Sequence, residues 1–271
     1  MNGASREALA AARERLDALT DNTSVDAAKL ADELAAVTAL LDREVSLRRV
    51  LTDPAQAGEA KAELAQRLLG GQVGGETADL LAGMVRSRWS QSRDLVDALE
   101  ELANTADLTA AQQAGTLDEV EDELFRFGRI VSSSTELRAA LTNRAATGSA
   151  KGELLRSLLG GRAKVTTERL VTRLVTAPRG RSLESGLESL SKLAADRRDR
   201  MVAVVTSAVP LSDRQKQRLG AALAKLYGRP MHLNLDVDPE VVGGIRVQVG
   251  DEVINGSLAD RIEDAGRRLA S

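Results

Sequence analysis

An internal repeat constrains the fold of this chain more than any other feature of its sequence. Residues 47–71 read LRRVLTDPAQAGEAKAELAQRLLGG, and residues 137–161 read LRAALTNRAATGSAKGELLRSLLGG. Aligned without a gap at an offset of 90 residues, the two agree at 14 of 25 positions. Unrelated segments of this composition would agree at roughly two or three positions, so the chain carries a duplicated unit of about ninety residues.

The duplication extends beyond this segment on both sides. At the same offset, Asp32-Glu33-Leu34 recurs as Asp122-Glu123-Leu124. Nearer the N-terminus the register slips, because Ser5-Arg6-Glu7 resembles Ser92-Arg93-Asp94 at an offset of 87. We therefore expect two related units, residues 1–91 and residues 92–198.

Both units are predicted to be helical and bundle-like. Their long stretches are rich in Ala, Leu, Glu and Arg, which favour helices, and contain few Gly or Pro residues. Apolar side chains follow the spacing of one helix face at Leu30, Leu34, Val37, Leu40 and Leu41, and again at Leu117, Val120, Leu124, Phe127 and Val131. The pairs Gly70-Gly71 and Gly160-Gly161 are expected to end helices.

The last third of the chain has a different pattern. Residues 201–207, MVAVVTS, are typical of a strand. Ser212 and Gln215 form a capping box that begins a helix. Alternating residues then predict strands at 231–237, 245–249 and 253–254, with a turn at Gly250-Asp251. Ser257 is expected to cap a final helix. The predicted fold is therefore α+β, with a β-α-β-β-β-α domain at residues 199–271 after the two helical units.

Composition excludes several classes of function. Aromatic residues make up 1% of the chain and the formal net charge is −3. Single-stranded nucleic acids are bound on aromatic platforms and basic surfaces, so we expect no nucleic-acid partner. There is no cysteine, which excludes thiol nucleophiles and thiolate metal sites. No run of eighteen apolar residues occurs, so we expect membrane association only through partner subunits.

Candidate catalytic and ligand-binding motifs are weak. His232, the single histidine, lies on the polar face of a predicted strand and is expected to face solvent. The acidic residues after this strand have the spacing of a calcium loop, but its required glycine and glutamate are replaced by Val241 and Val247. Lys61 and Lys151 follow glycines without the rest of a phosphate-binding loop, so we expect both to be solvated. We expect no catalytic, cofactor-binding or metal-binding residue.

Two further features have a structural interpretation. Trp89, near the boundary between the copies, is expected to be a packing anchor. The acidic run at residues 118–123 and the arginines at residues 197–200 are expected to be solvated, with contact to another subunit as the second interpretation.

Residues 238–257 contain a sequence signature, DPEVVGGIRVQVGDEVINGS. It joins an Asp-Pro pair, two aliphatic residues, a Gly-Gly pair that permits positive φ, an alternating strand, a glycine turn and a Gly-Ser pair. The signature residues are Asp238, Pro239, Gly243, Gly244, Gly250, Gly256 and Ser257. This pattern, together with TSAVPLS at residues 206–212, resembles the delta subunits of F-type ATP synthases, whose mitochondrial relative is the oligomycin-sensitivity-conferring protein. The resemblance covers about residues 92–271.

The resemblance implies a non-catalytic subunit of the stator, the peripheral stalk that supports proton-driven ATP synthesis. In this family, the helical domain grips N-terminal segments of alpha subunits in the catalytic head, and the C-terminal domain holds C-terminal helices of b-type stalk subunits. The implied location is the cytoplasmic side of the cell membrane, as a peripheral protein. Leu124, Phe127, Leu137 and Leu141 are candidates to line the alpha-subunit groove, with core packing as the alternative for such periodic apolar residues.

Residues 1–91 have no counterpart in a typical delta subunit and resemble the added copy of actinobacterial forms. We expect this copy to supply a second docking surface. A helical-repeat scaffold for an unrelated partner is the alternative function, and an enzyme using His232 is a third.

Overall fold

The computed structural model describes residues 2–20, 25–198, 201–227, 231–238, 244–249 and 252–255. The chain divides into two compact units. One, here called the helical unit, holds residues 1–16 and 27–198. The other, here called the sheet unit, holds residues 17–26 and 199–271.

Eleven helices are described up to residue 198, and they repeat with the period found in the sequence. They are α1 (Gly3–Thr20), α2 (Ala27–Arg43), α3 (Val45–Thr52), α4 (Gly58–Leu69), α5 (Gly75–Arg86), α6 (Ser92–Gln113), α7 (Leu117–Ser133), α8 (Thr135–Thr142), α9 (Gly148–Leu159), α10 (Val165–Thr176) and α11 (Leu183–Arg198). The bounds of α2 to α5 recur in α7 to α10 at an offset of 90 residues at every helix start and end. The duplication and its helical nature are thereby confirmed.

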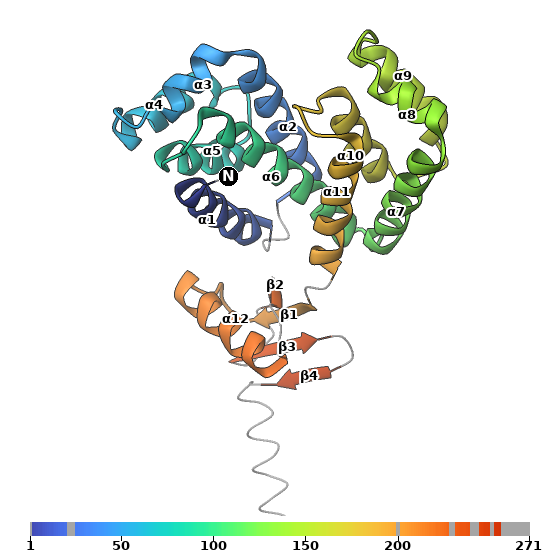
Figure 1. Cartoon of the computed structure of the whole chain (residues 1–271). Coiled ribbons are helices and arrows are strands. Elements are labelled where there is room, and N and C mark those ends of the chain that lie inside the picture. Colours follow the sequence, from blue (N-terminus) through green and yellow to red (C-terminus); the bar gives the residue numbers. More distant parts are fainter. Residues whose placement is uncertain are drawn as a thin grey trace, which may run out of the picture. The chain divides into compact units, whose positions relative to one another are not determined.

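Helix α6 takes part in both copies. It packs along α2 in the first copy, as α11 packs along α7 in the second, and it also contacts α7, α10 and α11. Figure 1 shows α6 running from the first group of helices into the second. Its described side chains are mostly buried, including Leu95, Leu99 and Leu102. A helix that is buried on most of its circumference lies between other helices, which agrees with its position between the copies.

One polar contact also repeats at the offset of 90. On α2, Glu33 accepts hydrogen bonds from the backbone N–H of the α5 N-cap residue, at 2.9 Å, and from the hydroxyl of Thr77. On α7, Glu123 accepts them from the N–H of the α10 N-cap residue, at 2.9 Å, and from the hydroxyl of Thr167, at 2.5 Å. The first N–H groups of a helix have no partner within the helix and carry partial positive charge. Each carboxylate therefore fixes the start of a helix within its own copy.

We expect Glu33→Ala and Glu123→Ala each to lower the free energy of unfolding by about 1–2 kcal/mol, because each removes the partner of a helix start. Denaturant unfolding of the full chain measures both. Glu63→Ala and Glu153→Ala, exposed residues at the same offset on α4 and α9, are matched controls with expected changes within about 0.5 kcal/mol. Equal effects in the capping and control variants would contradict the capping role.

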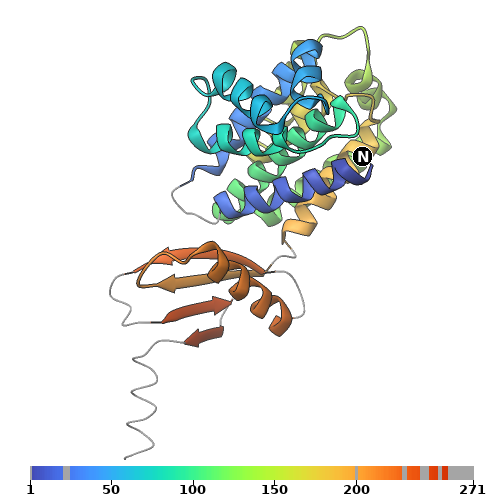
Figure 2. The same cartoon turned by 90° about the vertical axis from the view of Figure 1, so that its left-hand side faces the viewer.

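The sheet unit is a four-stranded sheet packed against a helix. Its elements are β1 (Met201–Ser207), α12 (Asp213–Tyr227), β2 (Met231–Val237), β3 (Ile245–Val249) and β4 (Glu252–Asn255). The strand order is β2-β1-β3-β4, with β1 parallel to β2 and the other neighbours antiparallel. The helix α12 lies against one face of the sheet (Figure 2), where Leu223 joins the core formed by Ala203, Val205 and Leu233. The α+β fold class is thereby confirmed.

Some predicted features of the sheet unit fall on residues that the structure does not describe. The Ser212–Gln215 contact is present, since the Gln215 side chain accepts hydrogen bonds from the N–H and hydroxyl of Ser212 at 2.9 and 2.7 Å. Val249 pairs with Glu252 across the two antiparallel strands, and the expected turn at residues 250–251 lies outside the described residues. The expected final helix after Ser257 also lies outside them.

Candidate functional site

Most of the residues predicted to line a groove lie in the core of the second copy. Leu124, Phe127 and Leu141 are buried in one apolar cluster, and Leu137 packs against it half-buried. Leu124 also lines a depression between α7 and α11. The periodic spacing that suggested these residues thus identifies the buried faces of α7 and α8.

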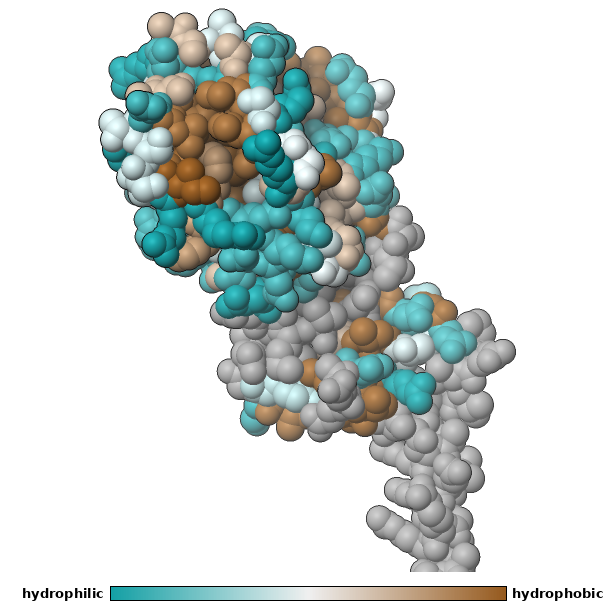
Figure 3. Space-filling view, turned by 90° about the vertical axis from the view of Figure 1, so that its right-hand side faces the viewer, coloured by the Kyte–Doolittle hydropathy of each residue, from teal (hydrophilic) through white to brown (hydrophobic). Residues whose placement is uncertain are grey.

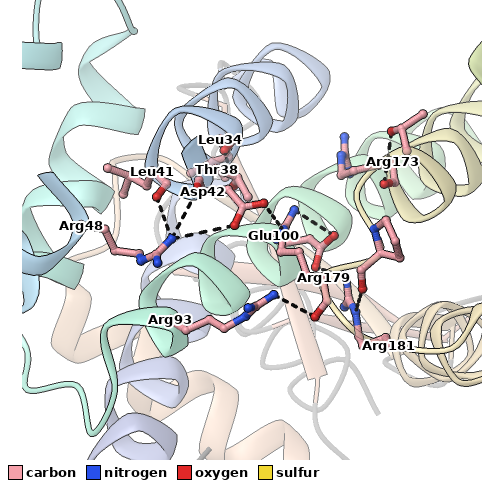
Figure 4. A network of polar contacts seen from close by, with 12 residues as sticks. Leu34, Thr38, Leu41, Asp42, Arg48, Arg93, Glu100, Arg173, Arg179 and Arg181 are labelled. Atoms are coloured by element: carbon pink, nitrogen blue, oxygen red, sulfur yellow. Dashed lines mark hydrogen bonds and ion pairs between the residues drawn. The ribbon is translucent and has the colours of Figure 1, made fainter. Parts of the chain in front are cut away.

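A buried polar network lies where the two copies meet, centred on Glu100 of α6 (Figure 4). The Glu100 carboxylate is 3.2 Å from Arg179 Nη2 and also binds Arg181. Arg179 Nε donates at 3.2 Å to Asp42 of α2, in the first copy. The side chains of Glu100 and Arg179 are only 2% and 5% exposed, so these charges interact with little screening by water.

The turn between α10 and α11 positions Arg179 and Arg181 beside Glu100. Arg179 has a φ of 48° and Gly180 a φ of 82°, and left-handed backbone at a residue other than glycine costs of order 1–3 kcal/mol. The Arg93 guanidinium donates to the Arg179 carbonyl at 2.8 Å. Contacts to both the side chain and the backbone of Arg179 therefore hold the turn in this conformation.

A second part of the network joins α6 and α10. Asp107 accepts hydrogen bonds at 2.8 Å from both Arg169 and Arg173, and Arg173 also donates to Asn104 at 2.5 Å. Burial raises the pKa of Asp107 above its ordinary value, although the positive charges of Arg173 and Arg169 lower it. Arg169 lies in addition 2.5 Å from Asp32 of α2. Burial lowers the pKa of the Arg169 guanidinium, but the contacts with Asp32 and Asp107 outweigh burial and raise the pKa overall.

The arrangement supports mechanical cohesion between the copies rather than a reaction. Its acidic and basic groups are paired with one another within the protein. The described ranges hold no group of three or more His, Asp or Glu side chains placed to bind a metal. His232 lies in β2 opposite Val202, and its side chain is outside the described part of the chain. Among the described residues, no helix has both the length and the apolarity needed to cross a bilayer.

The sequence did carry a signal for this network. Glu100, Asn104 and Asp107 share one face of α6, next to its apolar face, and Arg169 and Arg173 are one turn apart on α10. Polar groups at such positions need partners when the helix is buried. What the sequence could not supply was the turn at Arg179, which brings the third arginine to the first copy.

Several single residues have clear positions. Trp89 is buried and its indole N–H donates to the Met84 carbonyl at 2.8 Å, which confirms that it is a packing anchor.

The expectation that Lys61 is solvated is wrong: Lys61 is 4% exposed and its ammonium donates to the Ser87 carbonyl at 3.5 Å. Burial lowers the pKa of Lys61, and the charge of Asp53 opposes this shift.

The charged runs are solvated only in part, since Asp118, Glu119 and Asp122 are exposed as expected. Arg197 is buried and donates to Gln112 at 2.7 Å, and Arg198 pairs with Glu121 at 2.7 Å. Glu123 is the cap of α10 described above. These side chains hold α11, α7 and α10 in place within the second copy.

Comparison with known proteins identifies the family. The model of the ATP synthase delta (OSCP) subunit matches residues 105–269, more than half of the chain. The chain belongs to the ATP synthase delta (OSCP) subunit family. The ATP synthase subunit delta of Streptomyces coelicolor is 87% identical over 271 residues, covering 100% of this chain and 99% of that protein. That of Thermobifida fusca is 49% identical over 270 residues, covering 100% of both.

The match to the delta (OSCP) family model begins within α6, so it leaves out the first copy. The two relatives nevertheless align with the whole chain, so the chain and these relatives share the first copy. A chain in the cryo-EM structure of the Toxoplasma gondii mitochondrial ATP synthase hexamer is 21% identical, covering 62% of this chain and 95% of that one, at a TM-score of 0.28. That score is too low to inform the fold.

The delta-family signature lies partly within the described residues. Asp238 directly follows β2, and its N–H donates to the Ser207 carbonyl at 3.0 Å, so it fixes the end of β2 beside β1. Gly244 has a φ of 81°, which meets the expectation of positive-φ backbone before β3 and favours glycine there. Pro239, Gly243, Gly250, Gly256 and Ser257 lie outside the described residues.

Proposed function

We propose that this chain connects the catalytic head of ATP synthase to the membrane-anchored stalk by holding helical segments of both. As a delta (OSCP) family member, it is a non-catalytic subunit of the peripheral stalk, and it supports proton-driven ATP synthesis. The observation that carries this conclusion is the family match together with relatives that align along the whole chain. Family membership does not favour the alternative of a scaffold for an unrelated partner.

The proposed partners are those of the family. Residues 92–198 would hold N-terminal segments of alpha subunits, and residues 199–271 would hold C-terminal helices of b-type subunits. Residues 1–91 would add a second docking surface. The protein would then lie on the cytoplasmic side of the cell membrane, attached through these partner subunits.

The mechanical role makes a physical demand that this helical unit meets. A stator has to resist the torque on the head without changing shape. Rigid units with well-packed interiors and buried ion pairs meet this demand better than loosely linked ones. The shared helix α6 and the buried network around Glu100 and Asp107 supply such an interior between the two copies.

The function is tested by removing the chain from the native complex. We expect a tagged chain to purify with alpha and beta ATPase subunits, and membranes lacking it to lose proton-driven ATP synthesis while the detached head still hydrolyses ATP. Adding back the purified full chain should restore synthesis. Failure to purify with alpha and beta subunits, or unchanged coupling without the chain, would contradict the proposal.

A further inference from the structure

The repeat allows the charge of corresponding surfaces in the two copies to be compared. Residues 53–74 run from the C-cap of α3 to the N-cap of α5, and residues 143–164 run from the C-cap of α8 to the N-cap of α10. The first segment has a net charge of −1, from Lys61 and Arg67 against Asp53, Glu59 and Glu63. The second has a net charge of +4, from Arg144, Lys151, Arg156, Arg162 and Lys164 against Glu153. Two segments with the same helices therefore carry opposite charge.

The substitutions that separate the copies change the charge almost entirely in one direction. Two acidic residues of the first copy, Asp53 and Glu59, are replaced by Asn143 and Ser149. Four basic residues are gained at positions where the first copy is uncharged: Pro54, Gln66, Gln72 and Gly74 correspond to Arg144, Arg156, Arg162 and Lys164. One change is opposite, from Arg67 to Ser157. Since the helix bounds coincide at this offset, the fold itself does not require the positive charge.

Most of the added cations lack a partner within the chain. Arg144, Arg156 and Arg162 are exposed and make no ion pair with any residue that the structure describes. Lys164 is the exception, since it pairs with Glu119 at 3.4 Å. Charged side chains on a helix are usually only solvated, but the first copy covers the same helices with nearly balanced charge. Because like charges repel one another, the excess in the second copy points to a partner of opposite charge.

The unpaired cations are spread along α9. Arg144 precedes this helix, Arg156 lies in its last turn and Arg162 follows it. Twelve residues of helix extend over roughly 18 Å, which exceeds the screening length of about 8 Å at physiological salt. Figure 3 shows the side of the helical unit on which α7 to α9 lie, where hydrophilic side chains surround a hollow of apolar ones. One small anion cannot neutralise charges spread over the length of α9, so this surface suits a partner with several anionic groups.

The chemistry of the segment favours an acidic protein surface over a nucleic acid. Single strands stack their bases on aromatic side chains, and residues 143–164 contain no aromatic residue. Nucleic-acid-binding domains are also basic as a whole, whereas residues 92–198 hold sixteen basic and sixteen acidic residues. The positive charge is thus confined to one end of the second copy, where several carboxylates of a neighbouring protein would pair with it.

We propose that the α9 end of the second copy faces an acidic surface of a subunit of the catalytic head, and that this charge distinguishes the second copy from the first. The four helices α2 to α5 and α7 to α10 have matching bounds, so their secondary structure alone does not decide which copy meets the head. Exposed charges of this kind mainly raise the association rate and fix the orientation of binding. The inference rests on the proposed function for the identity of the partner.

Association kinetics test the role of the charge. The double variant Arg156→Gln with Arg162→Gln installs the first-copy residues at two exposed positions, so it should fold with unchanged melting temperature. We expect it to associate with complexes depleted of the chain about tenfold more slowly than the wild type at low salt, with the difference lost at high salt. Adding Gln66→Arg and Gln72→Arg restores the net charge in the first copy and should leave association slow.

The outcomes separate this inference from the proposed function. Equal association rates of the wild type and the double variant at low salt would overturn the inference alone. Recovery of the fast rate by Gln66→Arg with Gln72→Arg would also overturn it, because only net charge would then matter. A wild-type chain that does not bind the depleted complexes would contradict the proposed function, and this inference with it.

Zero-length crosslinking tests the chemistry and source of the partner. Arg156→Lys with Arg162→Lys keeps both charges and supplies primary amines, which a carbodiimide joins to carboxylates in direct contact. We expect this variant to associate as fast as the wild type. In the purified complex, its two new lysines should crosslink to Asp or Glu residues of alpha or beta subunits. Crosslinks to stalk subunits alone, or none in a complex that retains the chain, would overturn the proposed acidic surface of the head.

Discussion

Replacing Glu100 by alanine is expected to lower the free energy of unfolding by about 3–5 kcal/mol, since it leaves two paired arginines without their carboxylate. Arg179 is almost fully buried and Arg181 partly so. A guanidinium cannot lose its charge in a protein, so Arg179 cannot respond by becoming neutral. The turn at Arg179 would lose the contact that offsets its left-handed backbone. The loss should therefore exceed that of an ordinary surface ion pair several-fold.

The effect is measured by denaturant unfolding of the full chain. Glu101→Ala is the matched control, because Glu101 is adjacent in sequence and pairs with Arg13 at the more exposed surface of α6. Its expected change is within about 1 kcal/mol. Combining Glu100→Ala with Arg179→Met should recover part of the loss, since the unpaired buried charge is then gone. A loss for Glu100→Ala as small as that for Glu101→Ala would show that the network contributes little to stability.

Much of the fold could be predicted because the spacing of apolar residues typical of helices and that typical of strands are both local properties of the sequence. The apolar spacing of residues 30–41 and 117–131 predicted α2 and α7, β-branched residues predicted β1, and strand alternation predicted the later strands. The sharing of α6 was not predicted. Residue 92 was predicted to begin the second copy, but the face that α6 offers to α2 depends on contacts across the copies. The wide apolar face of α6 around Leu95, Val96 and Leu99 was the available signal.

The candidate site was harder to predict, for a physical reason. Leu124 and Phe127 were chosen by helical spacing, and that spacing marks the side of a helix that the core needs. Phe125, between them in sequence, points away from that face and is exposed. Whether an exposed aromatic residue lies in a depression depends on which helices are beside it, as α11 lies beside α7 here.

A chain that begins at Ser92, at the start of α6, is expected to lose cooperative folding of its helical part. Of the buried apolar residues on α6, only Leu108 and Ala111 belong to the core cluster of the second copy. Leu95, Val96, Leu99 and Leu102 lie outside that cluster and would be exposed without the first copy. At about 1.5–3 kcal/mol for each such side chain, the loss is comparable to the 5–15 kcal/mol that stabilises a typical domain.

Size-exclusion chromatography with light scattering and a circular dichroism melt measure the outcome for residues 92–271. We expect self-association and a broad, early transition, where the full chain gives a monomer with a sharp one. Adding a separate peptide of residues 1–91 should restore the sharp transition if the loss comes from uncovered α6. A truncated chain that stays monomeric and melts sharply would contradict the shared role of α6.

The docking role of the first copy is tested by surface substitutions and not by deletion, because the first copy also covers α6. Deleting residues 1–91 would disturb α6 and with it the second copy, so lost assembly would not distinguish docking from misfolding. Substitutions on the surface of the first copy separate the two. Glu63→Lys and Arg67→Glu alter the depression between α4 and α5 without reaching α6. Stable variants that no longer join head and stalk would place a docking surface there, and stable variants that assemble normally would limit the first copy to the support of α6.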